Sequence, residues 1–424
     1  MDKLSKNINF YLKLKKIFFP FYKSSDTKNL FRILEKDKPK NAQVAMFVGG
    51  CVRKFLNDED IDDIDIATIF SPKEIKEKFK DSNFKIIDTG IEHGSVTIII
   101  NSKKFEVTSL RQDVKTDGRH AEVSFIDNWK EDSERRDFTI NAIYMDIRGR
   151  IYDPQNGRED LKNNIINFIG DPSQRIAEDY LRIIRYLRFC IQYNIKNSEP
   201  KIINSIKLNL NGTKNLSKER ILSELNKIFN LQNINILTDN EEIRSIFLLI
   251  FPELKYLERL KKYTFATNPE LIFSVLLIDE KDNFEYFCHK YRVSNNLKSF
   301  LNLIAKNYNK YKEEKNFLKK DLKKNIYNCG KKNIKSLIKF IYCSESKFSE
   351  KLLVNLLDEV DKIKIPNFPF NGQYLKEKGL TEGKEIGFVL KELEKEWLDK
   401  DFNLNKNDAA TIIDKVKRSS VLNV

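Results

Sequence analysis

Two aspartates separated by one residue, Asp63 and Asp65, are the side chains of this chain best suited to do chemistry. Alternate residues of a β-strand share a face, so both carboxylates point the same way while Ile64 and Ile66 point into a core. Neighbouring carboxylates repel each other unless a cation lies between them. Magnesium takes oxygen ligands from one or two carboxylates and from the phosphates of a substrate. The pair therefore predicts a Mg²⁺-dependent phosphoryl-transfer site with Asp63 and Asp65 as metal ligands.

A pair of glycines precedes the aspartates, within the run Phe47-Val48-Gly49-Gly50-Cys51-Val52-Arg53. Because Gly49 and Gly50 lack Cβ atoms, a triphosphate can come close to their backbone, and N–H groups at the start of the following helix can face the anion. A glycine pair and a D-x-D pair are each weak signals alone. In this order and spacing they resemble the signature of the nucleotidyltransferase superfamily that contains DNA polymerase beta.

The resemblance is closest to bacterial class II tRNA nucleotidyltransferases, the CCA-adding enzymes, and to the related bacterial poly(A) polymerases. Motifs in the same order cover roughly residues 47 to 229. Residues 88–90 and 93–95 are similar to the family's T-G-x-x-H-G-T turn, with Ser95 in the last place. The loop through 117–120 matches one that is mobile in the family and contributes to switching between bases. The alternative for this loop is a plain hairpin tip.

A third carboxylate lies in residues 104–111, which are typical of a strand followed by a polar loop. Glu106 and Thr108 face opposite to Phe105 and Val107 on such a strand. The resemblance places Glu106 near the primer hydroxyl and a second metal ion, as a catalytic residue. The alternative is an ordinary surface strand residue.

An arginine pair opens the run Arg135-Arg136-Asp137-Phe138-Thr139-Ile140-Asn141-Ala142. Two adjacent arginines before a strand or helix start can reach a triphosphate. Asp137 can orient one of them or the sugar hydroxyl, and Asn141 can hydrogen-bond ribose or phosphate. A salt-bridged surface turn explains R-R-D but not the whole match to the family. The resemblance assigns Arg53 to nucleotide binding as well.

The run Glu178-Asp179-Tyr180-Leu181-Arg182 resembles the family's protein template for the incoming base. The sequence predicts one helix over 173–193, on which Asp179 and Arg182 are i and i+3 neighbours and Arg185 and Arg188 continue the row of nucleotide-binding arginines. In the template, Asp179 accepts from the exocyclic amine of cytosine or adenine, and Arg182 donates to the ring edge. Uracil and guanine leave buried polar groups unpaired. The alternative is an ordinary intrahelical ion pair.

Two further observations concern a helix after the template and the histidines of the whole chain. Residues 217–224 resemble the family's S-x-E-R-I-xx-E helix, whose expected role is to support the template helix. The chain has three histidines and no H-D pair, so we do not expect the metal-dependent phosphohydrolase domain that some relatives append.

Composition indicates a polyanionic partner. The net charge is +14 and the pI about 9.2, which favours binding to phosphates through counterion release; a lysine-rich genome bias is the alternative cause. No apolar run reaches the roughly 20 residues of a membrane span, and the basic N-terminal segment lacks the features of a targeting peptide. Five scattered cysteines without C-x-x-C argue for a reducing cytoplasm and against a zinc site.

Hydrophobic patterning divides the chain into a mixed head and a helical remainder, an α+β fold. Strands are expected at 45–48, 64–68, 85–88, 95–100, 105–108, 140–147 and 165–168. Helices are expected at 71–80, 173–193, 217–229, 240–249 and 350–363, among others. The expected domains are a helical lead-in, a nucleotidyltransferase head, a neck with the template helix, a body and a tRNA-binding tail, at 1–45, 46–168, 169–235, 236–350 and 351–424.

The resemblance implies a CCA-adding enzyme. In such an enzyme the 3′-hydroxyl of tRNA attacks the α-phosphate of CTP or ATP and pyrophosphate departs. We expect tRNA, CTP and ATP as partners, and neither DNA nor a membrane. Poly(A) polymerases and enzymes that add only CC or only A share these motifs and remain alternatives. A non-catalytic RNA-binding protein is less favoured because the metal ligands are intact, and a small-molecule nucleotidyltransferase needs no base template.

Overall fold

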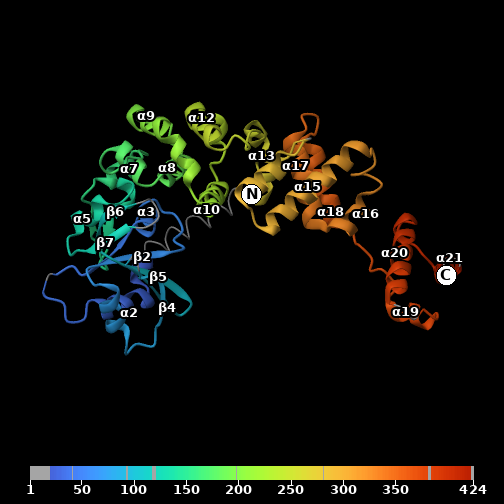
Figure 1. The fold of residues 1–424 in the computed structure, drawn as a ribbon, viewed down its shortest axis with the longest axis horizontal. Helices are drawn as coiled ribbons and strands as arrows, with labels where there is room; N and C mark the ends of the chain where they lie inside the picture. Colours follow the sequence, from blue (N-terminus) through green and yellow to red (C-terminus); the bar gives the residue numbers. More distant parts are fainter. Residues whose placement is uncertain are drawn as a thin grey trace, which may run out of the picture. The chain divides into compact units, whose positions relative to one another are not determined.

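The computed structural model describes residues 20–40, 42–91, 94–116, 121–196, 198–279, 281–380 and 383–421. The chain divides into two compact units, Met1–Pro252 and Glu253–Val424. Within the described residues the first unit combines sheet and helices, and the second contains helices without strands (Figure 1). The predicted α+β fold, a mixed sheet followed by a helical region, is therefore confirmed.

A seven-stranded mixed sheet forms the centre of the first unit, in the order β3-β4-β5-β2-β1-β8-β9. The pair β2 and β5 is parallel, whereas the other neighbours are antiparallel. A parallel pair requires a crossover connection, which here contains a helix and the β3–β4 hairpin. The strands are β1 (Ala45–Val48), β2 (Ile64–Thr68), β3 (Lys85–Gly90), β4 (Ser95–Ile100), β5 (Lys103–Ser109), β8 (Tyr144–Met145) and β9 (Ile151–Tyr152).

Five expected strands are confirmed, as β1 to β5, at 45–48, 64–68, 85–88, 95–100 and 105–108. The other two predictions are wrong. Residues 140–147 form only the two-residue β8, after the 3₁₀ turn η3 (Thr139–Asn141), and 165–168 makes a single bridge between Phe138 and Phe168. Asp137 accounts for the first of these, because its Oδ1 accepts hydrogen bonds from the backbone N of Phe138 and from Asn141 Nδ2, each 2.9 Å long, where the chain turns into η3.

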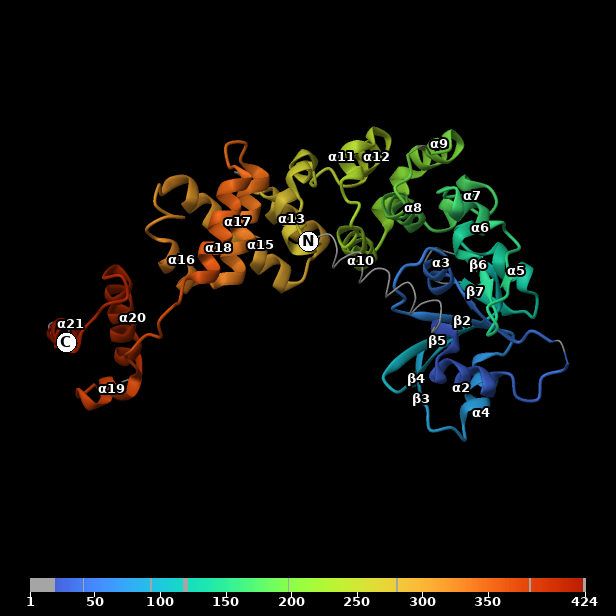
Figure 2. The same ribbon diagram turned by 180° about the vertical axis from the view of Figure 1, so that it is seen from behind.

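Helices of the first unit pack on this sheet and continue beyond it. Figure 2 shows α2 and α4 side by side near β3 and β4. The helix expected at 71–80 is α4, where Ser71 forms a capping box with Glu74 and Pro72 occupies the first turn. The helices are η1 (Phe21–Lys23), α2 (Ser25–Leu34), α3 (Gly50–Leu56), α4 (Pro72–Phe79), α5 (Trp129–Glu134), α6 (Gly157–Lys162), α7 (Pro172–Glu178), α8 (Leu181–Gln192), α9 (Pro200–Asn209), η4 (Leu210–Asn215), α10 (Lys218–Phe229), α11 (Ile236–Asp239) and α12 (Glu241–Ile250).

The helix predicted over 173–193 is broken into α7 and α8. Asp179 lies between them with extended backbone angles, φ −152° and ψ 102°. Its Oδ1 accepts a hydrogen bond of 3.1 Å from the backbone N of Leu181 and so satisfies a free donor in the first turn of α8. The prediction that Asp179 and Arg182 lie on one helical face is therefore wrong.

A separate two-stranded sheet, β6 (Arg111–Thr116) with β7 (Ala121–Phe125), follows β5. Its register places a hairpin where the sequence predicted a polar loop. The tip at 117–120, expected to help switch between bases, and His93 of the expected turn lie outside the described residues.

The second unit buries a C-terminal core around Trp397, with Phe370 and Leu393 among its members. In the described part of the chain, no helix is both long enough and apolar enough for a membrane crossing. The helices are η5 (Leu257–Lys262), α13 (Pro269–Leu277), α14 (Asn283–Tyr291), α15 (Asn295–Glu313), α16 (Leu322–Cys329), α17 (Lys331–Ser344), α18 (Glu350–Lys362), α19 (Gly372–Glu377), α20 (Gly383–Asp399) and α21 (Lys406–Val421).

We predict opposite effects from two Gly→Ala substitutions. A Cβ on Gly157 would lie 2.1 Å from the carbonyl oxygen of Thr139, so Gly157→Ala should destabilise the first unit by about 3 kcal/mol. Gly387 lies within α20 with open space around it, so Gly387→Ala should stabilise the second unit by about 0.5 to 1 kcal/mol. Hydrogen exchange in increasing urea reads the two units separately. A neutral Gly157→Ala would contradict the close packing of α6 on η3.

Candidate active site

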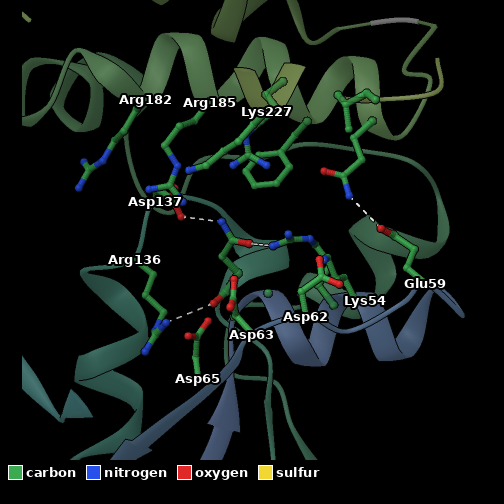
Figure 3. A pocket seen from close by; sticks show the side chains of 18 of the residues that line it. Lys54, Glu59, Asp62, Asp63, Asp65, Arg136, Asp137, Arg182, Arg185 and Lys227 are labelled. Atoms are coloured by element: carbon green, nitrogen blue, oxygen red, sulfur yellow. Dashed lines mark hydrogen bonds and ion pairs between the residues drawn. The ribbon is translucent and has the colours of Figure 1, made fainter. Parts of the chain in front are cut away.

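One pocket of the first unit, with a volume of about 840 Å³, gathers the predicted site residues (Figure 3). It is lined from the ends of β1 and β2, from the 135–141 segment, and from the helices α3, α8 and α10. Glu106 is the one predicted residue that does not line it. The predicted residues that do are Gly49, Gly50, Arg53, Asp63, Asp65, Arg135, Arg136, Asp137, Asn141, Asp179, Arg182, Arg185 and Arg188.

Three carboxylates lie together at the sheet end of this region. The register of the parallel pair β2–β5 sets Asp65 directly beside Glu106, and Asp63 immediately precedes β2. Burial, then the charge of Glu106, raises the pKa of Asp65 to about 6; the charge of Asp63 adds to this and Arg136 opposes it. In the described part of the chain these carboxylates have no hydrogen-bonding or ion-paired partner. Their unbalanced negative charge is the main electrostatic feature of the site.

This donor set fits a hard divalent cation. Among the described residues no three acidic, histidine or cysteine side chains form a ready-made metal cluster. Mg²⁺ does not need such a cage, because it binds through one or two carboxylates together with substrate phosphates and water. Asp63 and Asp65 offer the pair of unpartnered carboxylate groups that such binding requires.

The glycine turn brings backbone close to these carboxylates. Gly49 has φ +71°, a conformation that L side chains rarely adopt. A Cβ built there would lie 3.7 Å from Asp65 Oδ2 and 3.9 Å from Arg136 Nη1. The glycine thus leaves open the space between a carboxylate and an arginine, where a phosphate can be held.

Arg135 and Arg136 share a buried partner that sequence reasoning missed. Asp132, whose side chain is fully buried, lies 2.7 Å from Arg135 Nη2 and 3.0 Å from Arg136 Nη2. The Tyr144 hydroxyl donates to Asp132 (2.7 Å) and accepts from Arg136 Nε (3.1 Å). Although burial opposes it, the charges of Arg136 and Arg135 hold the pKa of Asp132 well below its usual value. The spacing of Asp132 three and four residues before the arginines was a readable signal.

A second network joins the 135–141 segment to α3 and α8. Asp137 Oδ2 lies 2.8 Å from Arg185 Nη2, so the arginine that Asp137 orients comes from α8. Arg53 is buried and donates through Nε to the Tyr193 hydroxyl (2.7 Å) and through Nη1 to Asn141 Oδ1. Figure 3 shows Arg185 reaching from the helix to Asp137, with Arg182 on the same helix beside it. The pocket is therefore built by side chains that are far apart in sequence.

Arg188 occupies a fixed place at the pocket wall. Its Nε lies 2.7 Å from Glu224 Oε2, and its guanidinium carbon lies 4.2 Å from the centre of the Phe189 ring. The partner, Glu224, belongs to α10, the helix expected to support the template. An ion pair and a cation–π contact together hold this arginine in position.

The two expected base readers each have an ion-paired partner outside the pocket lining. Asp179 Oδ2 lies 2.6 Å from Arg220 Nη2, and Arg182 Nη1 lies 2.6 Å from Glu178 Oε2. These contacts replace the Asp179–Arg182 ion pair that was the alternative interpretation. Both expected readers line the pocket.

Further pocket residues were not predicted. Arg111, at the start of β6, had a signal because it ends the strand motif of 104–111. The others come from loop and helix positions with no local pattern. These residues are Lys54, Glu59, Asp62, Arg111, Phe189, Gln192, Lys227, Asn230 and Leu231.

Comparisons with known proteins agree with this geometry. The family model "Poly A polymerase head domain" matches residues 45–167. The human protein "CCA tRNA nucleotidyltransferase 1, mitochondrial" is 32% identical over 422 residues, which cover 96% of this chain and 94% of the relative. The CCA-adding enzyme of Lactobacillus helveticus is 32% identical over 366 residues, covering 82% and 87%. The structure of the Bacillus stearothermophilus CCA-adding enzyme in complex with CTP shares the fold, with TM-score 0.71, 22% identity, and coverage of 95% and 100%.

We predict that Asp65→Asn stabilises the metal-free protein at neutral pH. The raised pKa means that ionised Asp65 disfavours the folded state above about pH 6, whereas the penalty disappears as pH falls toward the unfolded value of 3.8. The free energy of unfolding in EDTA should therefore rise by up to about 3 kcal/mol at pH 7.5 and by only about a third as much at pH 4.5. The exposed Asp81→Asn serves as control and should change stability by less than about 0.5 kcal/mol. An equal gain at both pH values would refute the electrostatic cause.

Proposed function

The chain belongs to the family of CCA-adding tRNA nucleotidyltransferases, and we propose that it adds CCA to the 3′ end of tRNA from CTP and ATP with release of pyrophosphate. The observation that carries the assignment is a single pocket that holds both a phosphate-facing set of arginines beside paired carboxylates and a base-facing acid and arginine. A polymerase of this kind must hold the triphosphate and choose the base without a nucleic-acid template. The pocket contains groups suited to both tasks.

For the nucleotidyl transfer we propose distinct roles for the acidic residues. Asp63 and Asp65 hold Mg²⁺, which when bound neutralises charge on the attacking and leaving oxygens. Glu106, beside Asp65 on β5, positions the primer 3′-hydroxyl or accepts its proton. The hydroxyl oxygen forms the new bond to the α-phosphorus, and the bond to the pyrophosphate oxygen breaks.

For triphosphate binding we propose Gly49, Gly50, Arg135 and Arg136, supported by the close approach of the glycine turn to Arg136. Arg53, Asp137 and Asn141 form a buried network behind them, and Arg185 and Arg188 extend the positive wall of the pocket. The guanidinium groups offer planar pairs of donors that match phosphate oxygens.

For base selection we propose Asp179 as acceptor and Arg182 as donor. Cytosine and adenine present an exocyclic amine to the carboxylate, whereas uracil and guanine present a carbonyl that leaves both groups unpaired. Asp179 acts from the break between α7 and α8, and Arg182 acts from the first turn of α8. Rigid partners on each reader support a fixed recognition geometry, which selection by hydrogen bonding requires.

The remaining assignments follow from the same proposal. We assign the head, neck, body and tail to residues 46–168, 169–235, 236–350 and 351–424, after a lead-in at 1–45, and expect tRNA to be bound through shape and backbone contacts. We also propose a cytoplasmic location, supported by five cysteines that are all free thiols.

Removal of either metal-binding carboxylate should stop the reaction without removing RNA binding. We expect Asp63→Ala and Asp65→Ala each to lower nucleotide addition by on the order of 10³-fold or more, while the Kd for tRNA stays within about threefold, since phosphate contacts come from basic residues. Single-turnover addition with Mg²⁺ and a filter-binding assay measure the two quantities. Asp81→Ala is the matched control. Full activity of either variant would remove the assignment.

Addition should stop after three nucleotides on a tRNA that lacks CCA. The completed end no longer fits between the base readers and the primer position, so excess ATP should not extend it. Sequencing of product ends after incubation with each NTP alone and with mixtures measures this. A generic RNA with the same 3′ base is the control, and long A tails on it would favour the poly(A) polymerase alternative.

A further inference from the structure

The side chain of Arg175 makes contacts outside its own helix. It lies in α7 and does not line the pocket. Its Nη2 donates to the backbone carbonyl oxygens of Arg135 (2.5 Å) and Arg136 (2.7 Å). One guanidinium thus holds the peptide backbone of the two arginines that face the triphosphate.

The other side of the same guanidinium is joined to the base reader. Arg175 Nη1 lies 2.5 Å from Glu178 Oε2, and this same oxygen lies 2.6 Å from Arg182 Nη1. Arg182 Nη1 also donates to the backbone carbonyl of Arg175, at 2.6 Å. Burial, then the charge of Arg182, lowers the pKa of Arg175. Glu178 therefore lies between two cations that would otherwise repel each other.

We propose that Arg175 is a positioning residue that holds the base-reading Arg182 and the phosphate-facing Arg135–Arg136 turn at a fixed distance, so that a nucleotide engages both only when its base is cytosine or adenine. This inference rests on the proposed function. A correct base places the triphosphate where the arginine turn is held. A wrong base leaves Arg182 without its hydrogen-bond partner on the base. The nucleotide then lacks the binding free energy that comes from contacting Arg182 and the arginine turn together.

An arginine is needed for this arrangement. Its planar group directs one nitrogen toward two carbonyl oxygens and the other toward a carboxylate, whereas lysine has a single ammonium at the end of a flexible chain. Arg175→Lys keeps the positive charge but cannot make all these contacts together. The substitution therefore tests geometry and not charge.

The chain offers a matched control. Arg259, in the second unit, donates through Nη1 to two backbone carbonyls, of Val275 (3.0 Å) and Ile278 (2.8 Å). Its side chain joins η5 to α13, and Arg259 is not among the residues that line the pocket. Arg259→Lys removes the same kind of two-carbonyl contact with no link to a base reader.

The experiment measures kcat/KM for CTP, ATP, UTP and GTP on a tRNA that lacks CCA, with the wild type, Arg175→Lys and Arg259→Lys. We expect Arg175→Lys to lower kcat/KM for CTP and ATP by about tenfold, the loss of a charge-assisted hydrogen bond. UTP and GTP do not make the base contacts, so their values should fall less and the preference ratio should shrink by at least about threefold. Arg259→Lys should leave the ratio unchanged.

Two results overturn the inference. In the first, Arg175→Lys keeps the wild-type preference ratio, even if all four kcat/KM values fall by the same factor, which indicates a structural role alone. If Arg175→Lys does not fold, Glu178→Gln, at a side chain that is 34% exposed, replaces it and should shrink the ratio in the same way; an unchanged ratio in Glu178→Gln is the second. A wild type that adds no nucleotide overturns the proposed function itself, whereas CCA addition with an unaltered ratio overturns only the role of Arg175.

Discussion

Parallel pairing of β2 with β5 is the constraint on which the rest of the first unit depends. It sets Asp65 beside Glu106 at the same level of the sheet, with Asp63 at the entrance to β2. The sheet core, in which Ile66 and Val107 are fully buried, holds this arrangement against charge repulsion. Hydrophobic burial thus supplies the free energy that keeps like charges together. Such a cluster is costly alone, and a bound cation would offset the repulsion.

Several arginines that line the pocket are ion-paired with acidic side chains outside the carboxylate cluster. Asp132 holds Arg135 and Arg136, Asp137 holds Arg185, and Glu224 holds Arg188. These ion pairs hold the guanidinium groups in position beside the carboxylates. The donors that remain free can then be offered to a substrate phosphate, with little reorganisation when it binds.

Many features of the fold could be read from local patterns. The strands β1 to β5 follow from alternation, and the start of α4 follows from Ser71, Pro72 and Glu74. The predictions failed where a polar side chain redirected the backbone. Asp137 turns the chain at η3, and Asp179 ends one helix and caps the next. Periodicity alone could not reveal either, because both segments keep a hydrophobic pattern through the break.

The sequence by itself determined the chemical inventory of this protein: paired carboxylates, a glycine turn, an arginine pair, and an acid and arginine suited to base edges. These depend on residue type and short spacing, which act through local backbone geometry. Only the tertiary structure decided which side chains of the site form hydrogen bonds and ion pairs with one another. Arg53 meets Asn141 and Tyr193 across 88 and 140 residues, and Arg175 reaches the backbone of Arg135 and Arg136 about 40 residues away. Contacts over such distances arise from packing of whole elements, and no local pattern encodes them.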